Sequence, residues 1–71
     1  MAFHKPSIRE IGIVEVSFGS GVEITNPVNL YGCSIGNDCF IGPFVEIQRN
    51  AIIGDRTRIQ SHCFICELVT I

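Results

Sequence analysis

Residues 33–71 read CSIGND CFIGPF VEIQRN AIIGDR TRIQSH CFICEL VTI when they are divided every six positions. Each block opens with a small residue, any residue and an aliphatic residue, as in Cys33-Ser34-Ile35. An amphipathic α-helix repeats its apolar residues about every 3.6 positions, and a two-faced sheet alternates strictly between turns of variable length. A constant period of six fits neither pattern. It indicates a solenoid of very short strands joined by sharp turns, with three blocks in each triangular coil of about 18 residues.

The same unit recurs further towards the N-terminus, with one irregular spacing. Three more units keep the period among themselves: Val28-Asn29-Leu30, Val22-Glu23-Ile24 and Val16-Ser17-Phe18. Leu30 and Ile35 are only five residues apart, so we expect one corner of the coil to be a residue short. Upstream of Val16 the aliphatic residues do not follow the period. The sequence therefore predicts an N-terminal entry segment at residues 1–15, either a strand or a short cap over the first coil, and an all-β repeat of about three coils at residues 16–71.

Each position of the repeat has a predicted direction. The aliphatic residue points inward and stacks on its equivalent in the next coil, the small residue points inward near a corner, and the residue between them points outward. The predicted stacks are Ile35 with Ile53 and Ile71, Ile41 with Ile59, and Leu30 with Ile47 and Ile65. Gly36, Gly42 and Gly54 follow aliphatic residues, and we expect them to supply a positive φ at the turns.

The cysteine positions argue against a disulfide scaffold. Cys33, Cys39 and Cys63 occupy the small inward position of the repeat, so we expect reduced thiols that pack as small core residues. Cys63 and Cys66 have the spacing of a CxxC metal or redox motif, and His62 precedes them. The alternation turns Cys63 inward and puts Cys66 at a corner, so the two thiols should diverge. We predict no metal site.

Composition and charge favour a soluble cytoplasmic protein that binds neither nucleic acid nor membrane. The net charge is −2, and the five basic residues do not cluster as a nucleic-acid footprint would. The chain starts without the long apolar run of a signal peptide or membrane span. It stops at Ile71, an inward position within a predicted strand, where an uncovered solenoid end would be prone to aggregation. We expect either a truncated longer protein or an end covered by another copy.

The best candidates for function are polar residues where the repeat would normally have glycine. Gln48, Gln60 and Cys66 occupy this corner position. The coil geometry places Asn29, Tyr31, Glu46 and Gln48 on one edge, with Gln60, Ser61 and His62 leading into the same face from the previous corner. Amide, hydroxyl, carboxylate and imidazole groups around an aromatic ring suit a polar ligand. The alternative is that these residues are polar because they face solvent.

His62 and Glu46 are the candidate catalytic residues. A neutral imidazole is the usual base for removing a proton from an attacking amine or hydroxyl, which is the role predicted for His62. Glu46 is predicted to orient the imidazole or to recognise a substrate amine. The alternatives are that His62 only caps a turn and that Glu46 pairs with Arg49 or Arg58 in water.

Four segments carry a resemblance to a known family. They are NPVNLYG at residues 26–32, IGPFVEIQ at 41–48, IQSH at 59–62 and FICE at 64–67. With the repeat, they resemble the hexapeptide-repeat acyltransferases. The nearest members acetylate the 3-amino group of a UDP-linked 2-acetamido-3-amino-2,3-dideoxy-glucuronate, and enzymes acting on dTDP-linked 3-amino sugars are close relatives. The resemblance extends over residues 22–71.

The resemblance implies a left-handed parallel β-helix that forms a homotrimer and uses acetyl-CoA as co-substrate, without a metal. The product would serve the synthesis of bacterial polysaccharides such as lipopolysaccharide. In such families the sugar nucleotide lies in a cleft between two subunits, which here would include Asn29, Glu46, Gln48 and His62. A full family member continues for several coils that carry most acetyl-CoA contacts. This chain therefore looks like an N-terminal fragment holding part of a site, with the acetyl-CoA contacts beyond residue 71.

Two alternative functions use the same fold. One is a non-catalytic scaffold or oligomerisation module, which would not need Gln48, Gln60 or His62. The other is an enzyme like the γ-type carbonic anhydrases, which require three zinc-binding histidines. The chain has two histidines, and one of them, His4, lies outside the repeat.

Overall fold

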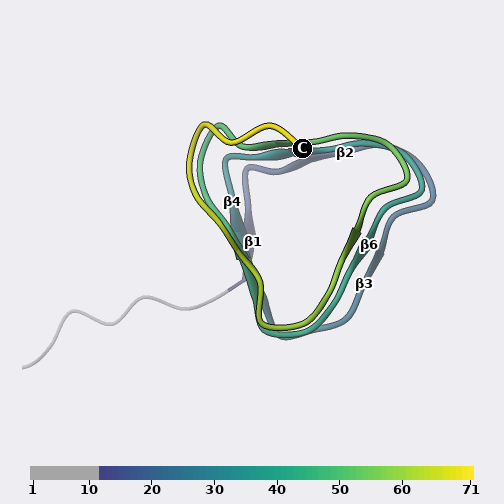
Figure 1. The fold of residues 1–71 in the computed structure, drawn as a ribbon, viewed down its shortest axis with the longest axis horizontal. Coiled ribbons are helices and arrows are strands. Elements are labelled where there is room, and N and C mark those ends of the chain that lie inside the picture. The colour runs from purple at the N-terminus through teal and green to yellow at the C-terminus, as the bar shows by residue number, and fades with distance from the viewer. Residues whose placement is uncertain (1–11) are drawn as a thin grey trace, which may run out of the picture.

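The computed structural model describes residues 12–71 and forms a triangular coil of short strands (Figure 1). The predicted entry segment at residues 1–15 therefore falls mostly outside the described residues. All regular structure in the described part is β-strand, in three parallel sheets that form the three sides of the triangle. No helix in this part is long and apolar enough to cross a membrane.

The strands are short because each side of the triangle is only a few residues long. Sheet A contains β1 (Ile13–Val14), β4 (Val28–Tyr31), β7 (Val45–Ile47) and β10 (Phe64–Ile65). Sheet B contains β2 (Ser17–Phe18), β5 (Ser34–Ile35) and β8 (Ile52–Ile53). Sheet C contains β3 (Glu23–Ile24), β6 (Phe40–Ile41) and β9 (Arg58–Ile59). Each strand thus pairs with the strand three places further along the chain, which is the connectivity of a solenoid.

The coil is left-handed. In Figure 1 the chain passes clockwise from β1 through β2 to β3, and it approaches the viewer as its colour changes from faded purple to yellow. A path that turns clockwise while it approaches the viewer is a left-handed helix. The chain therefore folds as a left-handed parallel β-helix of about three turns, as the resemblance implied.

The short corner occurs twice. Leu30 pairs with Ile13 and also with Ile47, and both pairs are 17 positions apart, whereas Ile47 and Ile65 are 18 apart. Ile13 to Phe18 thus repeats the five-residue spacing of Leu30 to Ile35. For this reason β1 is already part of sheet A, and pairing in the coil begins before the predicted boundary at residue 16.

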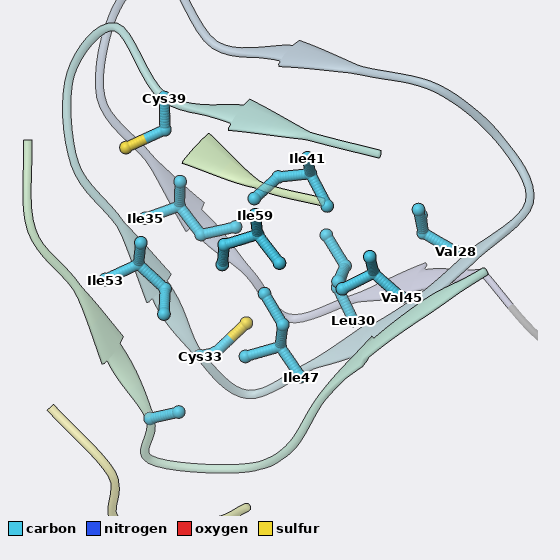
Figure 2. Packing of buried hydrophobic residues seen from close by; sticks show 11 residues of the cluster. Val28, Leu30, Cys33, Ile35, Cys39, Ile41, Val45, Ile47, Ile53 and Ile59 are labelled. Atoms are coloured by element: carbon cyan, nitrogen blue, oxygen red, sulfur yellow. The ribbon is translucent and has the colours of Figure 1, made fainter. Parts of the chain in front are cut away.

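The inward positions of the repeat form the core. The buried set consists of predicted inward residues of the central coils, both aliphatic residues and small residues near the corners: Val28, Leu30, Cys33, Ile35, Cys39, Ile41, Val45, Ile47, Ala51, Ile53 and Ile59. Its labelled members converge on the interior of the triangle in Figure 2. Predicted inward residues of the outer coils, such as Ile24 and Ile65, are only partly buried. The predicted stacks are confirmed where residues pair in register: Ile35 with Ile53, Ile41 with Ile59, and Ile47 with both Leu30 and Ile65. Ile71, predicted to extend the first stack as an inward residue, is 49% exposed and does not belong to the core. Full burial of each large side chain contributes roughly 1.5–3 kcal/mol.

The prediction that Gly36, Gly42 and Gly54 supply a positive φ is wrong. At all three of these corners, the positive φ lies two residues later in the turn, at Asp38 (56°), Phe44 (59°) and Arg56 (60°). The glycines are required for a different reason, which is the close approach of the next coil. A Cβ atom on Gly36 would lie 2.9 Å from the backbone nitrogen of Asp55, and one on Gly42 would lie 3.0 Å from that of Ser61.

Candidate functional site

The outer face of sheet A presents a column of non-aliphatic side chains. Asn29 on β4 pairs in register with Glu46 on β7, which pairs with Phe64 on β10. Their neighbours on either side point inward, so these three side chains point outward, as the alternation predicted. Asn29 and Glu46 are half-buried, whereas Phe64 is exposed.

Glu46 is the centre of this column. Its Oε1 accepts a hydrogen bond from Asn29 Nδ2 at 3.4 Å. Its Oε2 accepts one from the Tyr31 hydroxyl at 3.4 Å and one from Gln48 Nε2 at 3.2 Å. The structure therefore brings together Asn29, Tyr31, Glu46 and Gln48, the four residues predicted to share this edge. Three donors hold the carboxylate in one orientation on the face of the sheet.

Gln48 also ties this edge to the next coil. Its Oε1 accepts a hydrogen bond from the backbone N–H of Glu67 at 3.1 Å. The side chain thus bridges Glu46 and the corner that follows β10, which explains why glutamine takes the place of glycine here.

The arginine pairing considered for Glu46 is not formed in the described part of the chain. Arg49 instead pairs with Glu15, with 3.4 Å between Nη1 and Oε2, in an exposed contact that contributes little to stability. Arg58 lies over the ring of Phe40 on the outer face of sheet C, 5.9 Å from its centroid. The carboxylate of Glu46 is therefore oriented by neutral donors.

His62 lies at the corner that leads from sheet C into sheet A. Its backbone has φ 64°, and Phe44, at the same corner one coil earlier, has φ 59°. The two rings stack with their centroids 5.0 Å apart and an interplanar angle of 19°. Both side chains are exposed. Phe44 was not predicted as a site residue, although it is 18 positions before His62, one full coil.

An open cavity of about 360 Å³ joins the corner to the outer face of sheet A. Its lining residues come from three successive coils: Pro27, Val28, Asn29, Phe44, Val45, Glu46, His62, Cys63 and Phe64. Three of the predicted site residues, Asn29, Glu46 and His62, thus share one cavity. Tyr31 and Gln48 are not among the lining residues, but both donate hydrogen bonds to Glu46, which is. Gln60 and Ser61 lie at the exposed start of the corner and are not among the residues that line the cavity.

Two of the four cysteines, Cys33 and Cys39, belong to the core. All four are free thiols; Cys33 and Cys39 are buried, Cys63 is half-buried and Cys66 is exposed. Burial raises the pKa of the Cys33 thiol above its usual value, although backbone hydrogen bonds oppose the effect. Within residues 12–71, no group of three or more histidine, cysteine, aspartate or glutamate side chains is placed to hold a metal ion.

Comparison with protein families identifies the repeat. Residues 32–67 match the family described as bacterial transferase hexapeptide (six repeats). Comparisons with curated proteins and with solved structures gave no match. The matched segment extends from the corner after β4 to the corner after β10, so it includes Glu46, His62 and most of the cavity. Because it covers half of the chain, this protein belongs to the bacterial transferase hexapeptide family.

Proposed function

We propose that this chain contributes the acceptor site of an acetyl-CoA-dependent N-acetyltransferase acting on an amino group of a UDP- or dTDP-linked sugar. Such an enzyme would modify precursors of bacterial polysaccharides in the cytoplasm. The family membership supports a transferase of the acyl-transferring type. The nucleotide-sugar acceptor is supported by the chemistry of the outer face of sheet A and by the resemblance of residues 22–71 to nucleotide-sugar N-acetyltransferases.

One observation carries the proposal: a carboxylate, an amide and an imidazole line the same cavity on the outside of the coil. Glu46 is held by three donors, and Asn29 and His62 flank the space in front of it. A cavity in which polar groups converge beside apolar surface is the usual form of a small-molecule site. A wall of Phe44 and Phe64 rings supplies the apolar surface.

The proposed reaction assigns one role to each catalytic candidate. The neutral amine of the sugar attacks the thioester carbonyl of acetyl-CoA, so that a C–N bond forms and the C–S bond breaks. His62 accepts the proton that the amine loses and returns it to the leaving thiolate. Glu46 holds the amine in position, and hydrogen-bond donors in the assembled site stabilise the tetrahedral oxyanion.

A homotrimer is part of the proposal. The cavity is open, and the aromatic side chains at its edge, Phe44 and Phe64, are 58% and 57% exposed. A neighbouring subunit packed beside sheet A would bury these rings and close the cavity around the sugar. Aromatic residues are enriched at the centres of such interfaces.

The scaffold is the one alternative that a specific observation favours. All three hydrogen bonds to Glu46 come from side chains of its own coil or of the preceding one, as in a purely structural ladder. A scaffold would not, however, need the exposed imidazole of His62 at the rim of the cavity. Binding of a sugar nucleotide therefore separates the two functions.

Calorimetric titration of the chain with UDP- and dTDP-linked amino sugars tests the proposed function. We expect one of the two classes to bind the wild-type protein and to bind the Gln48→Ala and His62→Ala variants more weakly. The matched control is Ser34→Ala, an exposed change on the outer face of sheet B. Unchanged affinity in both site variants, or no binding by the wild type, would favour the scaffold.

A further inference from the structure

The two oxygens of the Glu46 carboxylate have different surroundings. Oε2 accepts two hydrogen bonds, from Tyr31 and Gln48, whereas Oε1 accepts one, from Asn29. A carboxylate offers about four acceptor positions, two on each oxygen. Within residues 12–71, Oε1 therefore has one position left for a donor.

That position belongs to the cavity side of the carboxylate. Asn29, the partner of Oε1, lines the cavity, whereas Tyr31 and Gln48, the partners of Oε2, are not among its lining residues. The three existing bonds are 3.2–3.4 Å long, at or beyond the long end of the usual range. They orient the carboxylate and leave its negative charge available to a stronger donor.

The other lining groups favour a cation and disfavour an anion. Of the residues lining the cavity, Glu46 is the one carboxylate, and neither lysine nor arginine is among them. The rings of Phe44 and Phe64 also line it, and the faces of aromatic rings attract cations. A diphosphate or a second carboxylate would meet the Glu46 charge with no lysine or arginine in the lining to offset it. His62 is the one lining side chain that can become positively charged, and the proposed reaction uses it as a neutral base.

We propose that this cavity recognises the acceptor as a protonated amine, held by Glu46 Oε1 and bounded by the rings of Phe44 and Phe64. The inference rests on the proposed function. It also defines how the nucleotide-linked amino sugar is oriented: its ammonium group lies in the cavity and its diphosphate lies outside. The ammonium gives up one proton, through His62 to solvent, before its lone pair attacks. An acetylated nitrogen is neutral, so the same recognition favours release of the product.

The first test compares amino sugars with neutral sugars on the wild-type chain. The probes are glucosamine and 3-amino-3-deoxyglucose, with glucose and N-acetylglucosamine as neutral counterparts, and the amide signals of Glu46 and Cys63 in nuclear magnetic resonance spectra measure occupancy. We expect at least one amino sugar to half-saturate these signals at a concentration about tenfold lower than glucose does, since hydrogen bonds between charged groups are the stronger ones. Equal concentrations, or no binding by any probe, would overturn the inference.

The second test uses two variants that remove the same charge. Glu46→Gln removes it from the cavity, and Glu23→Gln removes it from the exposed outer face of β3. The preference for the amino sugar should disappear in Glu46→Gln and persist in Glu23→Gln. A preference that survives in Glu46→Gln, or that both variants lose equally, would contradict recognition by Glu46.

Acetyl transfer is measured separately, by release of the free thiol of coenzyme A. Acetyl transfer to a nucleotide-linked amino sugar, by a chain that binds amino sugars no more tightly than neutral sugars, would support the proposed function and reject this inference. An amine preference that depends on Glu46, without calorimetric binding of any UDP- or dTDP-linked amino sugar, would support the inference and reject the nucleotide-sugar acceptor of the proposed function.

Discussion

At the scale of single residues, position in the coil decides whether a side chain acts in the core or on the surface. Ile52 and Ile53 are adjacent isoleucines in β8, yet one is 50% exposed and the other 1%. Glu46 and Ile47 show the same division in β7, where the outward residue contributes to the cavity and the inward one to the core. Substitutions of neighbouring residues can therefore separate effects on function from effects on stability.

We expect Ile53→Ala to lower the free energy of unfolding by about 2–5 kcal/mol, because it removes a fully buried side chain and leaves a cavity. The matched control is Ile52→Ala, the same change one residue earlier on the exposed face, which should cost much less. Chemical denaturation followed by circular dichroism measures both. Equal losses in the two variants would show that the inward and outward faces have been assigned wrongly.

The His62→Ala variant should bind sugar nucleotides more weakly and still fold. The imidazole is exposed, so its loss leaves no core cavity; the left-handed backbone at φ 64° costs alanine about 1–2 kcal/mol. His62→Asn separates the two effects, because asparagine tolerates this conformation and lacks the imidazole. Calorimetry and thermal denaturation measure the outcome. Unfolding of both variants would show that the residue is structural.

At the scale of the elements, the turns are more demanding than the strands. Glycine occupies only two of the left-handed corner positions within residues 12–71, at Gly21 and Gly32. The others carry Glu15, Asp38, Phe44, Asn50, Arg56, His62 and Leu68. A non-glycine residue with positive φ is uncommon, and the sequence gives no signal that it will occur in these turns. The corner glycines could be identified from the repeat, but their role depends on how closely successive coils approach, which a linear pattern does not contain.

Gly36→Ala should destabilise the coil by about 1–3 kcal/mol, as an overpacking substitution. The added Cβ would lie 2.9 Å from the backbone nitrogen of Asp55 and 3.0 Å from the carbonyl carbon of Gly54, and backbone atoms cannot turn aside as a side chain can. Ser34→Ala, two residues earlier and exposed, is the control. Thermal denaturation of both variants tests this, and a neutral Gly36→Ala would show that adjacent coils can separate at this corner.

At the scale of the whole molecule, the six-residue period was sufficient to predict the three sheets and the inward residues of the central coils, from Val28 to Ile59. It did not predict the exposure of Ile71, which it assigns to the interior. The period does not determine the hand of the coil, which came from the resemblance. A strand before residue 16 was one of the two predicted forms of the entry segment, but its place in sheet A was not predicted, because the five-residue spacing recurs between Ile13 and Phe18. The edge around Glu46 was predictable, since residues one coil apart lie side by side. The stacking of Phe44 on His62 was not predicted, because the repeat shows that the two residues are one coil apart but does not show how two exposed rings orient at a corner.

We expect light scattering to give a mass three times that of the chain. Three copies that pack beside sheet A would bury Phe44 and Phe64, which are otherwise more than half exposed. Phe64→Ser should shift the mass towards that of a single chain, whereas Ile52→Ser, on the outer face of sheet B, should not. A monomeric wild type would remove the trimer from the proposal.

An acceptor site on the outer face of sheet A is tested most directly by mapping the binding of a UDP-linked amino sugar onto the isotope-labelled chain by nuclear magnetic resonance. We expect shifts in the amide signals of Asn29, Glu46, His62 and Phe64, around the cavity on sheet A, and unchanged signals for Ser34 and Ile52 on sheet B. Shifts confined to sheets B or C, or no shifts at millimolar sugar nucleotide, would contradict an acceptor site on this face.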